Sequence, residues 1–143
     1  MTGNAFAPAS PVDIEGMDWR IFLEAQPHTL LIGEEVRARS ILTTYERYLA
    51  PPIVEWRPPT PLNAPPFGTL VIWDVDRLSL MQQRSCLGWM DRNAAAVQVI
   101  SVAPRTLLPL VQARAFLPEL YYRLNTVCLS LNRDAEALTV AMS

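Results

Sequence analysis

Residues 33–40 have the spacing of a phosphate-binding loop without its side chains. The segment reads Gly-Glu-Glu-Val-Arg-Ala-Arg-Ser, whereas such a loop reads Gly-x-x-x-x-Gly-Lys-Ser. The glycines let backbone N–H groups close on an anion, and the lysine ammonium reaches the outer phosphates. Here Ala38 replaces the second glycine, Arg39 replaces the lysine, and Val36 further hinders close approach of the backbone. The candidate nucleotide-contacting residues of this segment are Gly33, Glu34, Arg39 and Ser40.

Length and charge narrow the classes of function. A chain of 143 residues has the length of a single domain. We expect a flexible arm over 1–16 followed by one domain over 17–143. The net charge of −2 and the pI of about 5.3 provide no broad basic field, so we expect no direct nucleic-acid binding. All 12 basic residues are arginine, which we attribute to a biased codon pool.

Cysteine usage and hydropathy point to a cytoplasmic protein. Cys86 and Cys128 are far apart in the chain and have no second pair, which is typical of two reduced, buried thiols. With only one histidine, His28, the chain supplies too few soft ligands for a metal site, and His28 has no neighbouring nucleophile. The apolar runs are shorter than the roughly 20 residues that a membrane span needs. We therefore expect no metal and no membrane contact.

Apolar runs and helical periodicity alternate along the chain. This alternation predicts an α/β fold, a five-stranded parallel sheet with helices on both faces. Ser79 is an expected helix cap and Pro118 an expected first-turn residue. The predicted strands are 29–33, 53–56, 69–74, 97–103 and 126–131. The predicted helices run from about Asp18 to before Pro27, through 38–49, and over 80–92, 106–114 and 118–124, with a last short one after Asn132.

Two candidate residues follow predicted strands. In open parallel sheets, ligands bind beyond the carboxyl ends of the strands. Gly33 ends the first strand and Asp74 ends the third, so we expect both at one edge of the sheet. Between the second and third strands lies the proline-rich segment 57–67, which we interpret as a stiff connector, with a polyproline docking ligand as the alternative.

Three segments resemble the ATPase (AAA+) domain of sigma-54-dependent transcriptional activators, also called the sigma-54-interaction domain. Residues 68–83, Gly-Thr-Leu-Val-Ile-Trp-Asp-Val-Asp-Arg-Leu-Ser-Leu-Met-Gln-Gln, are similar to its Walker B region. Residues 116–125, Phe-Leu-Pro-Glu-Leu-Tyr-Tyr-Arg-Leu-Asn, are similar to its Phe-Arg-Glu-Asp-Leu-Tyr-Tyr-Arg-Leu-Asn segment, and residues 30–34 to the start of its Walker A motif. The three occur in the family's order and cover roughly residues 17–131. The resemblance implies a P-loop NTPase fold.

The departures from this family fall on its catalytic positions. Trp73 stands where the family has the aspartate that holds magnesium, and Asp74 stands at its catalytic glutamate. Pro104 falls on the sensor position. Of two arginines that act across subunits, Leu117 replaces the first and only Arg123 is kept. We therefore expect a short, degenerate variant that lacks the sigma-contact loop, the helical lid and the DNA-binding helix-turn-helix.

Several of these residues have two interpretations. Arg39 is either a substitute phosphate clamp or, as we prefer, a solvated helix arginine. Asp74 either holds a water or metal or is an inactive residue at a strand end. Arg123 is either an intersubunit finger or, by preference, the partner of Glu119 one turn earlier. Trp73 is expected to be a packing group that fills the vacated site.

The sequence thus predicts a non-catalytic regulatory module that acts by protein contact in bacterial transcription control. The expected partner is a protein, either a full-length activator or another transcription component. The alternatives are a weak ATP-binding protein or residual ATPase that uses Arg39 and Asp74, and a scaffold unconnected with transcription. No cofactor is expected, and any binding of ATP and magnesium would be weak because charge neutralisation by lysine and magnesium is lost.

Overall fold

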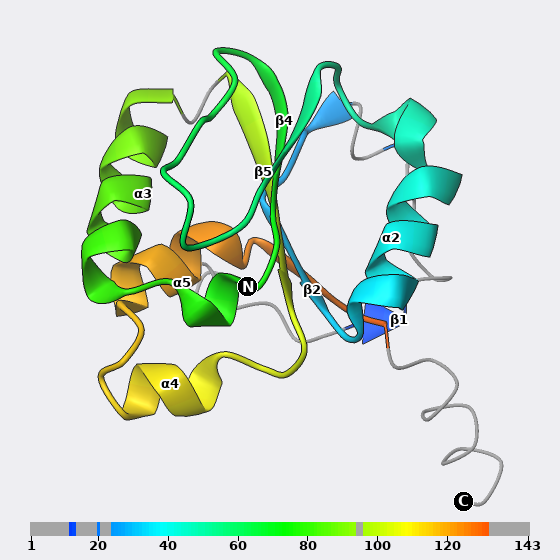
Figure 1. Ribbon diagram of the computed structural model, residues 1–143. Coiled ribbons are helices and arrows are strands. Elements are labelled where there is room, and N and C mark those ends of the chain that lie inside the picture. Colours follow the sequence, from blue (N-terminus) through cyan, green and yellow to red (C-terminus); the bar gives the residue numbers. More distant parts are fainter. Residues whose placement is uncertain (1–11, 14–19, 21–23, 94–95, 132–143) are drawn as a thin grey trace, which may run out of the picture.

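Six parallel strands form a single sheet at the centre of the protein (Figure 1). The structure is a computed structural model that describes residues 12–13, 20, 24–93 and 96–131. Along the sheet the order is β1-β6-β2-β5-β4-β3. The strands are β1 Val12–Asp13, β2 Thr29–Ile32, β3 Ile53–Trp56, β4 Gly68–Ile72, β5 Val97–Ala103 and β6 Val127–Ser130.

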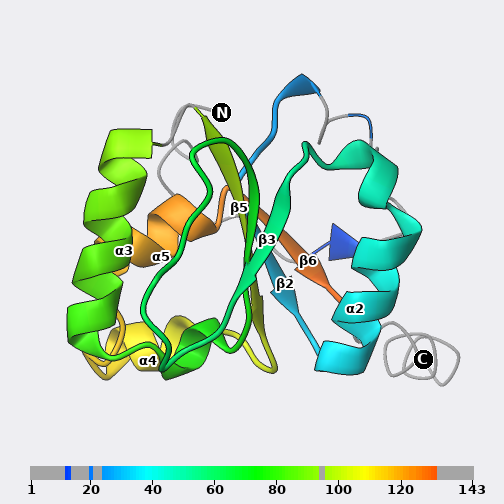
Figure 2. The same ribbon diagram turned by 45° about the horizontal axis from the view of Figure 1, so that its top comes forward.

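Helices cover both faces of the sheet, so the predicted three-layer α/β fold with a parallel sheet is confirmed (Figures 1 and 2). One face packs on α2, and the opposite face packs on α3 and α5. The helical elements are α2 Glu35–Thr44, η3 Glu46–Tyr48, η4 Val75–Arg77, α3 Leu80–Asn93, α4 Leu108–Gln112 and α5 Pro118–Leu124. The predicted helix between Asp18 and Pro27 lies mostly outside the described residues, and the one after Asn132 lies entirely outside them.

The sequence analysis did not predict β1. Val12 and Asp13 pair with Leu129 and Ser130 of β6, within the segment that we expected to be a flexible arm. A two-residue strand has no hydrophobic period of its own, and only the open edge of β6 gives it a partner. The five predicted strands correspond to β2 to β6, and each is wholly or partly buried. Every residue of β2, β4 and β5 is buried.

Local signals fixed the start of α3. The Ser79 hydroxyl accepts a hydrogen bond from the Gln82 backbone N–H at 3.1 Å, and the Gln82 side chain accepts one from the Ser79 N–H at 2.9 Å. This reciprocal pair is a capping box, which satisfies two backbone donors that the first helical turn leaves unpaired. The helix start predicted at Ser79 is therefore confirmed.

The proline-rich segment 57–67 crosses from β3 to β4 on the face covered by α3. Leu62 and Ala64 pack against the core there, and the Trp56 indole N–H donates a 2.7 Å hydrogen bond to the Thr60 carbonyl. The segment covers one end of the sheet without forming a helix. These contacts support its interpretation as a connector.

Candidate functional site

The connection between β2 and α2 is too short to form a phosphate cradle. Strand β2 ends at Ile32 and α2 begins at Glu35, which leaves only Gly33 and Glu34 between them. The Gly33 N–H donates to the Ala103 carbonyl at 2.9 Å, and the Ala38 N–H donates to the Glu34 carbonyl at 3.0 Å. These N–H groups serve the sheet and the helix, so they do not converge on an anion. The spacing of residues 33–40 is that of a loop, yet six of the eight residues are helical.

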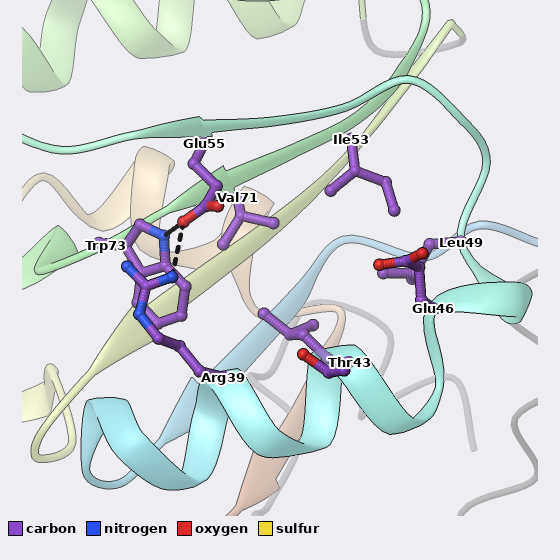
Figure 3. Close-up of a pocket in the computed structure, with 9 residues that line it drawn as sticks. Arg39, Thr43, Glu46, Leu49, Ile53, Glu55, Val71 and Trp73 are labelled. Atoms are coloured by element: carbon purple, nitrogen blue, oxygen red, sulfur yellow. Dashed lines mark hydrogen bonds and ion pairs between the residues drawn. The ribbon is translucent and has the colours of Figure 1, made fainter.

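Arg39 is held by three contacts within the chain, and Figure 3 shows the two with Glu55 and Trp73. Its Nε donates to Glu35 Oε2 at 2.9 Å and its Nη1 donates to Glu55 Oε1 at 3.1 Å. The guanidinium carbon also lies 4.3 Å from the ring centroid of Trp73, a cation–π geometry. Arg39 lies on α2 and is half-exposed, in agreement with the preferred interpretation as a solvated helix arginine. What the sequence did not predict is that its guanidinium has partners within the chain, because β3 and β4 bring Glu55 and Trp73 beside α2.

Asp74 pairs with Arg57, a residue that the sequence analysis did not select. Arg57 Nη1 donates to Asp74 Oδ2, and Arg57 Nη2 donates to Glu35 Oε2 at 2.7 Å. The register of the sheet explains the pair: Trp56 lies beside Ile72, so the residues that follow the two strands meet at the same edge. Gly33 follows β2 at this carboxyl edge too, as predicted. Asp74 itself has left-handed backbone angles, φ 53° and ψ 47°.

Glu35 is the shared acceptor of both arginines. Its Oε2 receives hydrogen bonds from Arg39 and Arg57, and the bond from Arg57, followed by that from Arg39, lowers the pKa of the Glu35 carboxyl below its usual value. Glu35 lies in the first turn of α2, where the helix dipole also favours a negative charge. A carboxylate of the chain itself therefore takes the place next to these guanidinium groups that an anionic ligand would need.

Trp73 is almost fully buried, with 3% of its surface exposed, beneath Arg39. Its indole N–H donates to Glu55 Oε1 at 2.6 Å, so its polar atom is satisfied inside the protein (Figure 3). The interpretation of Trp73 as a packing group agrees with this burial. Glu55, like Arg57, was missed by the sequence analysis. It is the one charged residue of β3, and the strand's sequence alone does not show which side chain it contacts.

We call these residues the ion-pair cluster: Glu35, Arg39, Glu55, Arg57, Trp73 and Asp74. Its three carboxylates and two guanidinium groups leave one net negative charge, which disfavours a further anion. The groove beside it has a volume of about 100 Å³, small against the roughly 300–1,000 Å³ of ordinary ligand pockets. Its lining consists of Arg39, Leu42, Thr43, Glu46, Leu49, Ile53, Glu55, Val71 and Trp73.

The remaining predicted site residues lie away from this cluster or make no contact with it. Ser40 is exposed on α2, where its carbonyl accepts a 2.8 Å hydrogen bond from the Thr44 hydroxyl. Arg123 lies on α5, on the opposite face of the sheet. The expected pairing of Arg123 with Glu119 is wrong, because α3 packs beside α5 and offers Asp91, which accepts a hydrogen bond from Arg123 Nη2 in an ion pair.

Other candidate groups are structural. Cys86 and Cys128 are buried, as predicted, and burial raises the pKa of Cys86 to about 12 and that of Cys128 to about 11, so neither is a reactive thiolate. Within the described ranges no three His, Cys, Asp or Glu side chains gather as metal ligands. Over the same ranges, no helix is both long and apolar enough to cross a bilayer.

Comparison by sequence finds no relatives: no family model matches the chain, and no curated protein matches it. Comparison with solved structures does find similar folds. Brucella abortus NtrX in complex with ATP superposes with a TM-score of 0.61 at 12% identity over 87% of this chain, and the complex with ADP with a TM-score of 0.60 at 13% identity over 79%. These matches cover 36% and 33% of the NtrX chains, so this chain spans about a third of NtrX.

A second neighbour is the P-loop NTPase domain of the sigma-54 transport activator from E. coli. It superposes with a TM-score of 0.53 at 23% identity, over 79% of this chain and 99% of that domain. The likeness therefore extends over essentially the whole of an isolated P-loop NTPase domain. At these identities the likeness shows the fold: the chain has the α/β fold of these P-loop NTPase-like neighbours.

Proposed function

We propose that this protein is a catalytically degenerate AAA+-type module that acts by protein contact in bacterial transcription regulation. The observation that carries the proposal is the position of Glu35, whose Oε2 accepts hydrogen bonds from Arg39 at 2.9 Å and from Arg57 at 2.7 Å. In this arrangement the cations at the carboxyl edge of the sheet already have an anionic partner within the chain. A nucleotide would have to displace that partner before it could bind.

The chemistry of phosphoryl transfer supports the same proposal. Such catalysis depends on positioning and on neutralisation of the phosphate charge by lysine, magnesium and arginine. The residue at the resembled lysine position, Arg39, is bound to two carboxylates, and the residue at the magnesium position, Trp73, carries no acidic group. Asp74, beside it, is engaged by Arg57. No group remains at these positions to hold magnesium and phosphate together.

The regulatory role is inferred from the fold of the neighbours. One of them is a domain of a sigma-54 activator, and another, NtrX, was crystallised with ATP and with ADP. A domain that keeps this architecture but lacks the residues for phosphate chemistry keeps surfaces that other proteins can bind, although it has no catalytic site. We infer that those surfaces contact a full-length activator or another transcription component.

Calorimetry with ATP and magnesium tests the loss of nucleotide chemistry. We expect negligible heat and no release of phosphate, since even a dissociation constant of about 1 mM corresponds to only about 4 kcal/mol of binding free energy. Micromolar binding that is lost in Arg39→Ala and Asp74→Asn would overturn this part of the proposal. It would favour the alternative function, a weak ATP-binding protein or residual ATPase.

Light scattering tests assembly. Arg123 is held by Asp91 on the face opposite the ion-pair cluster, and we expect no nucleotide to bridge subunits. The molar mass should therefore be the same with and without ATP. A ring that forms only when ATP is added would contradict the proposed degeneracy.

A further inference from the structure

Helix α3 presents an exposed apolar and basic stripe on its outer side. Five residues spaced at i, i+1, i+4, i+5 and i+8 fall on one side of a helix. Met81 is 77% exposed and Leu80 40% exposed, which is high for large apolar side chains. We call the stripe the α3 face, and it consists of Leu80, Met81, Arg84, Ser85 and Gly88.

The opposite side of α3 is fixed to the core, so the α3 face is a rigid platform. Gln83, Cys86 and Met90 are buried beneath the helix. The Gln83 amide donates to the carbonyls of Leu78 at 3.0 Å and Ala115 at 2.9 Å, and its oxygen accepts from the Leu117 N–H at 2.8 Å. These bonds tie the first turns of the helix to the segment before α5. A partner would bind without first having to order this helix.

Gly88 has no structural reason within the protein to be glycine. It lies in the interior of α3, where glycine destabilises a helix relative to alanine. A Cβ added there would meet only an Arg92 guanidinium nitrogen at 3.5 Å, an ordinary contact. A glycine in a helix that is not required by its own fold is useful where another backbone approaches closely from outside.

The charges on this side of the helix that form no ion pair among the described residues are positive. Arg84 and Arg92 continue the spacing of the α3 face at i+4 and i+12 from Leu80, and within the described part of the chain neither forms a salt bridge. The acidic residue of the helix, Asp91, is already paired with Arg123. Two copies of this face would repel each other, which disfavours a symmetric pair. An acidic partner is complementary to it.

We propose that the α3 face is a docking surface for an amphipathic helix of a partner protein that carries acidic residues beside its apolar stripe. Apolar anchors of that helix would pack on Leu80 and Met81, its carboxylates would meet Arg84 and Arg92, and its backbone would pass over Gly88. Arginine and methionine are enriched at protein interfaces, and an amphipathic helix that packs its apolar face on another protein is a recurring recognition mode. This proposal rests on the proposed protein-contact function and specifies the surface and the chemistry of the partner.

A synthetic helical peptide with leucines at i, i+3, i+4 and i+7 and glutamates on both flanks tests this directly. We expect saturable binding by fluorescence anisotropy, weakened by salt, with amide chemical-shift changes concentrated in residues 79–93. Met81→Asp should weaken binding about tenfold or more, as truncation of an interface anchor does. Gly88→Leu should do the same by blocking close approach.

Val36→Asp is the matched control. Val36 is 75% exposed on α2, against 77% for Met81, so the same substitution changes a comparable surface on the other face of the sheet. It should leave peptide affinity unchanged within about twofold, and thermal unfolding checks that all variants are folded.

Three results would each overturn the proposal: no binding up to about 1 mM peptide, equal loss in Val36→Asp and Met81→Asp, or equal binding of a peptide with serines in place of the leucines. Equal binding of single-stranded RNA in place of the peptide would also overturn the proposal, because it would show that the surface binds any anionic polymer. These outcomes are independent of the ATP calorimetry, so failure of this docking surface and failure of the proposed degeneracy can be told apart.

Discussion

The guanidinium of Arg39 lies 4.3 Å from the ring centroid of Trp73. These are the residues that the family resemblance places at the Walker lysine and at the magnesium-binding aspartate. In this protein they contact each other, and the Trp73 indole N–H and Arg39 Nη1 both donate to Glu55 Oε1. Two positions that would otherwise meet across a nucleotide and a metal ion thus form part of a closed network of side chains.

Removing the shared acceptor should expose an anion site. In Glu35→Gln, Arg39 and Arg57 lose their common carboxylate, and the net charge of the ion-pair cluster changes from −1 to 0. We expect pyrophosphate binding to appear in the millimolar range by calorimetry, and we expect none in the unmodified protein. Glu46→Gln is the control, because Glu46 lines the far part of the groove. Equal gains in both variants would show that overall charge, not the Glu35 bridge, keeps anions out.

Restoring the acidic residue at position 73 should damage the fold rather than create a metal site. Trp73→Asp removes a buried indole, leaves a cavity and places a buried carboxylate beside that of Glu55. The free energy of unfolding, measured in urea, should fall by about 3–5 kcal/mol. Trp73→Phe keeps most of the volume and loses the hydrogen bond to Glu55, so it should cost about 1–2 kcal/mol. Near-unchanged stability of Trp73→Asp, or ATPase activity in it, would contradict this expectation.

His28 should make stability depend on pH. Its Nδ1 accepts a 3.0 Å hydrogen bond from the Val99 N–H, which requires that nitrogen to be unprotonated. Burial lowers the pKa of His28 below 6.5, and the nearby charge of Arg123 lowers it further. Because the unfolded chain takes up the proton first, stability is lost as the pH falls from about 6.5 toward the folded pKa, and the loss then stops.

Chemical unfolding at pH 7 and pH 5 measures the contribution of His28 to the pH dependence of the free energy of unfolding. His28→Asn keeps a side-chain acceptor near the Val99 N–H but has no group that titrates. The carboxylates are the same in both proteins, so their contribution to the pH dependence of stability cancels in the comparison. The unmodified protein should lose more stability between these pH values than His28→Asn. An equal or smaller loss would show that His28 does not carry the effect.

Alanine substitutions at Gly68 and Gly88 should change the free energy of unfolding in opposite directions. Gly68 has φ +103°, and a Cβ there would lie 2.4 Å from the Pro52 carbonyl oxygen, so Gly68→Ala forces backbone to move. We expect a loss of about 2 kcal/mol or more in the free energy of unfolding. Gly88→Ala should instead stabilise the protein by roughly 0.5–1 kcal/mol, since the position is helical and the added Cβ would make only an ordinary contact with Arg92. Destabilisation by Gly88→Ala would mean that the core of the protein itself needs that glycine.

The sequence by itself determined the layers of this fold. Strands β2, β4 and β5 are continuous apolar runs, and the start of α5 at Pro118 and of α3 after Ser79 follow local capping rules. These signals depend on neighbours within one or two turns of the chain, so they are readable without the fold. The sequence also located Gly33 and Asp74 at one edge of the sheet, because parallel strands bring their carboxyl ends together.

Only the tertiary structure decided which charges meet. Arg57 and Asp74 are 17 residues apart and become partners through the register of β3 and β4, while Arg57 reaches Glu35 from a distance of 22 residues. The same sequence pattern would have allowed Arg123 to pair with Glu119, but packing of α3 on α5 supplied Asp91 instead. A side-chain pair across elements depends on their relative position to within an ångström or two, and no local pattern encodes that distance.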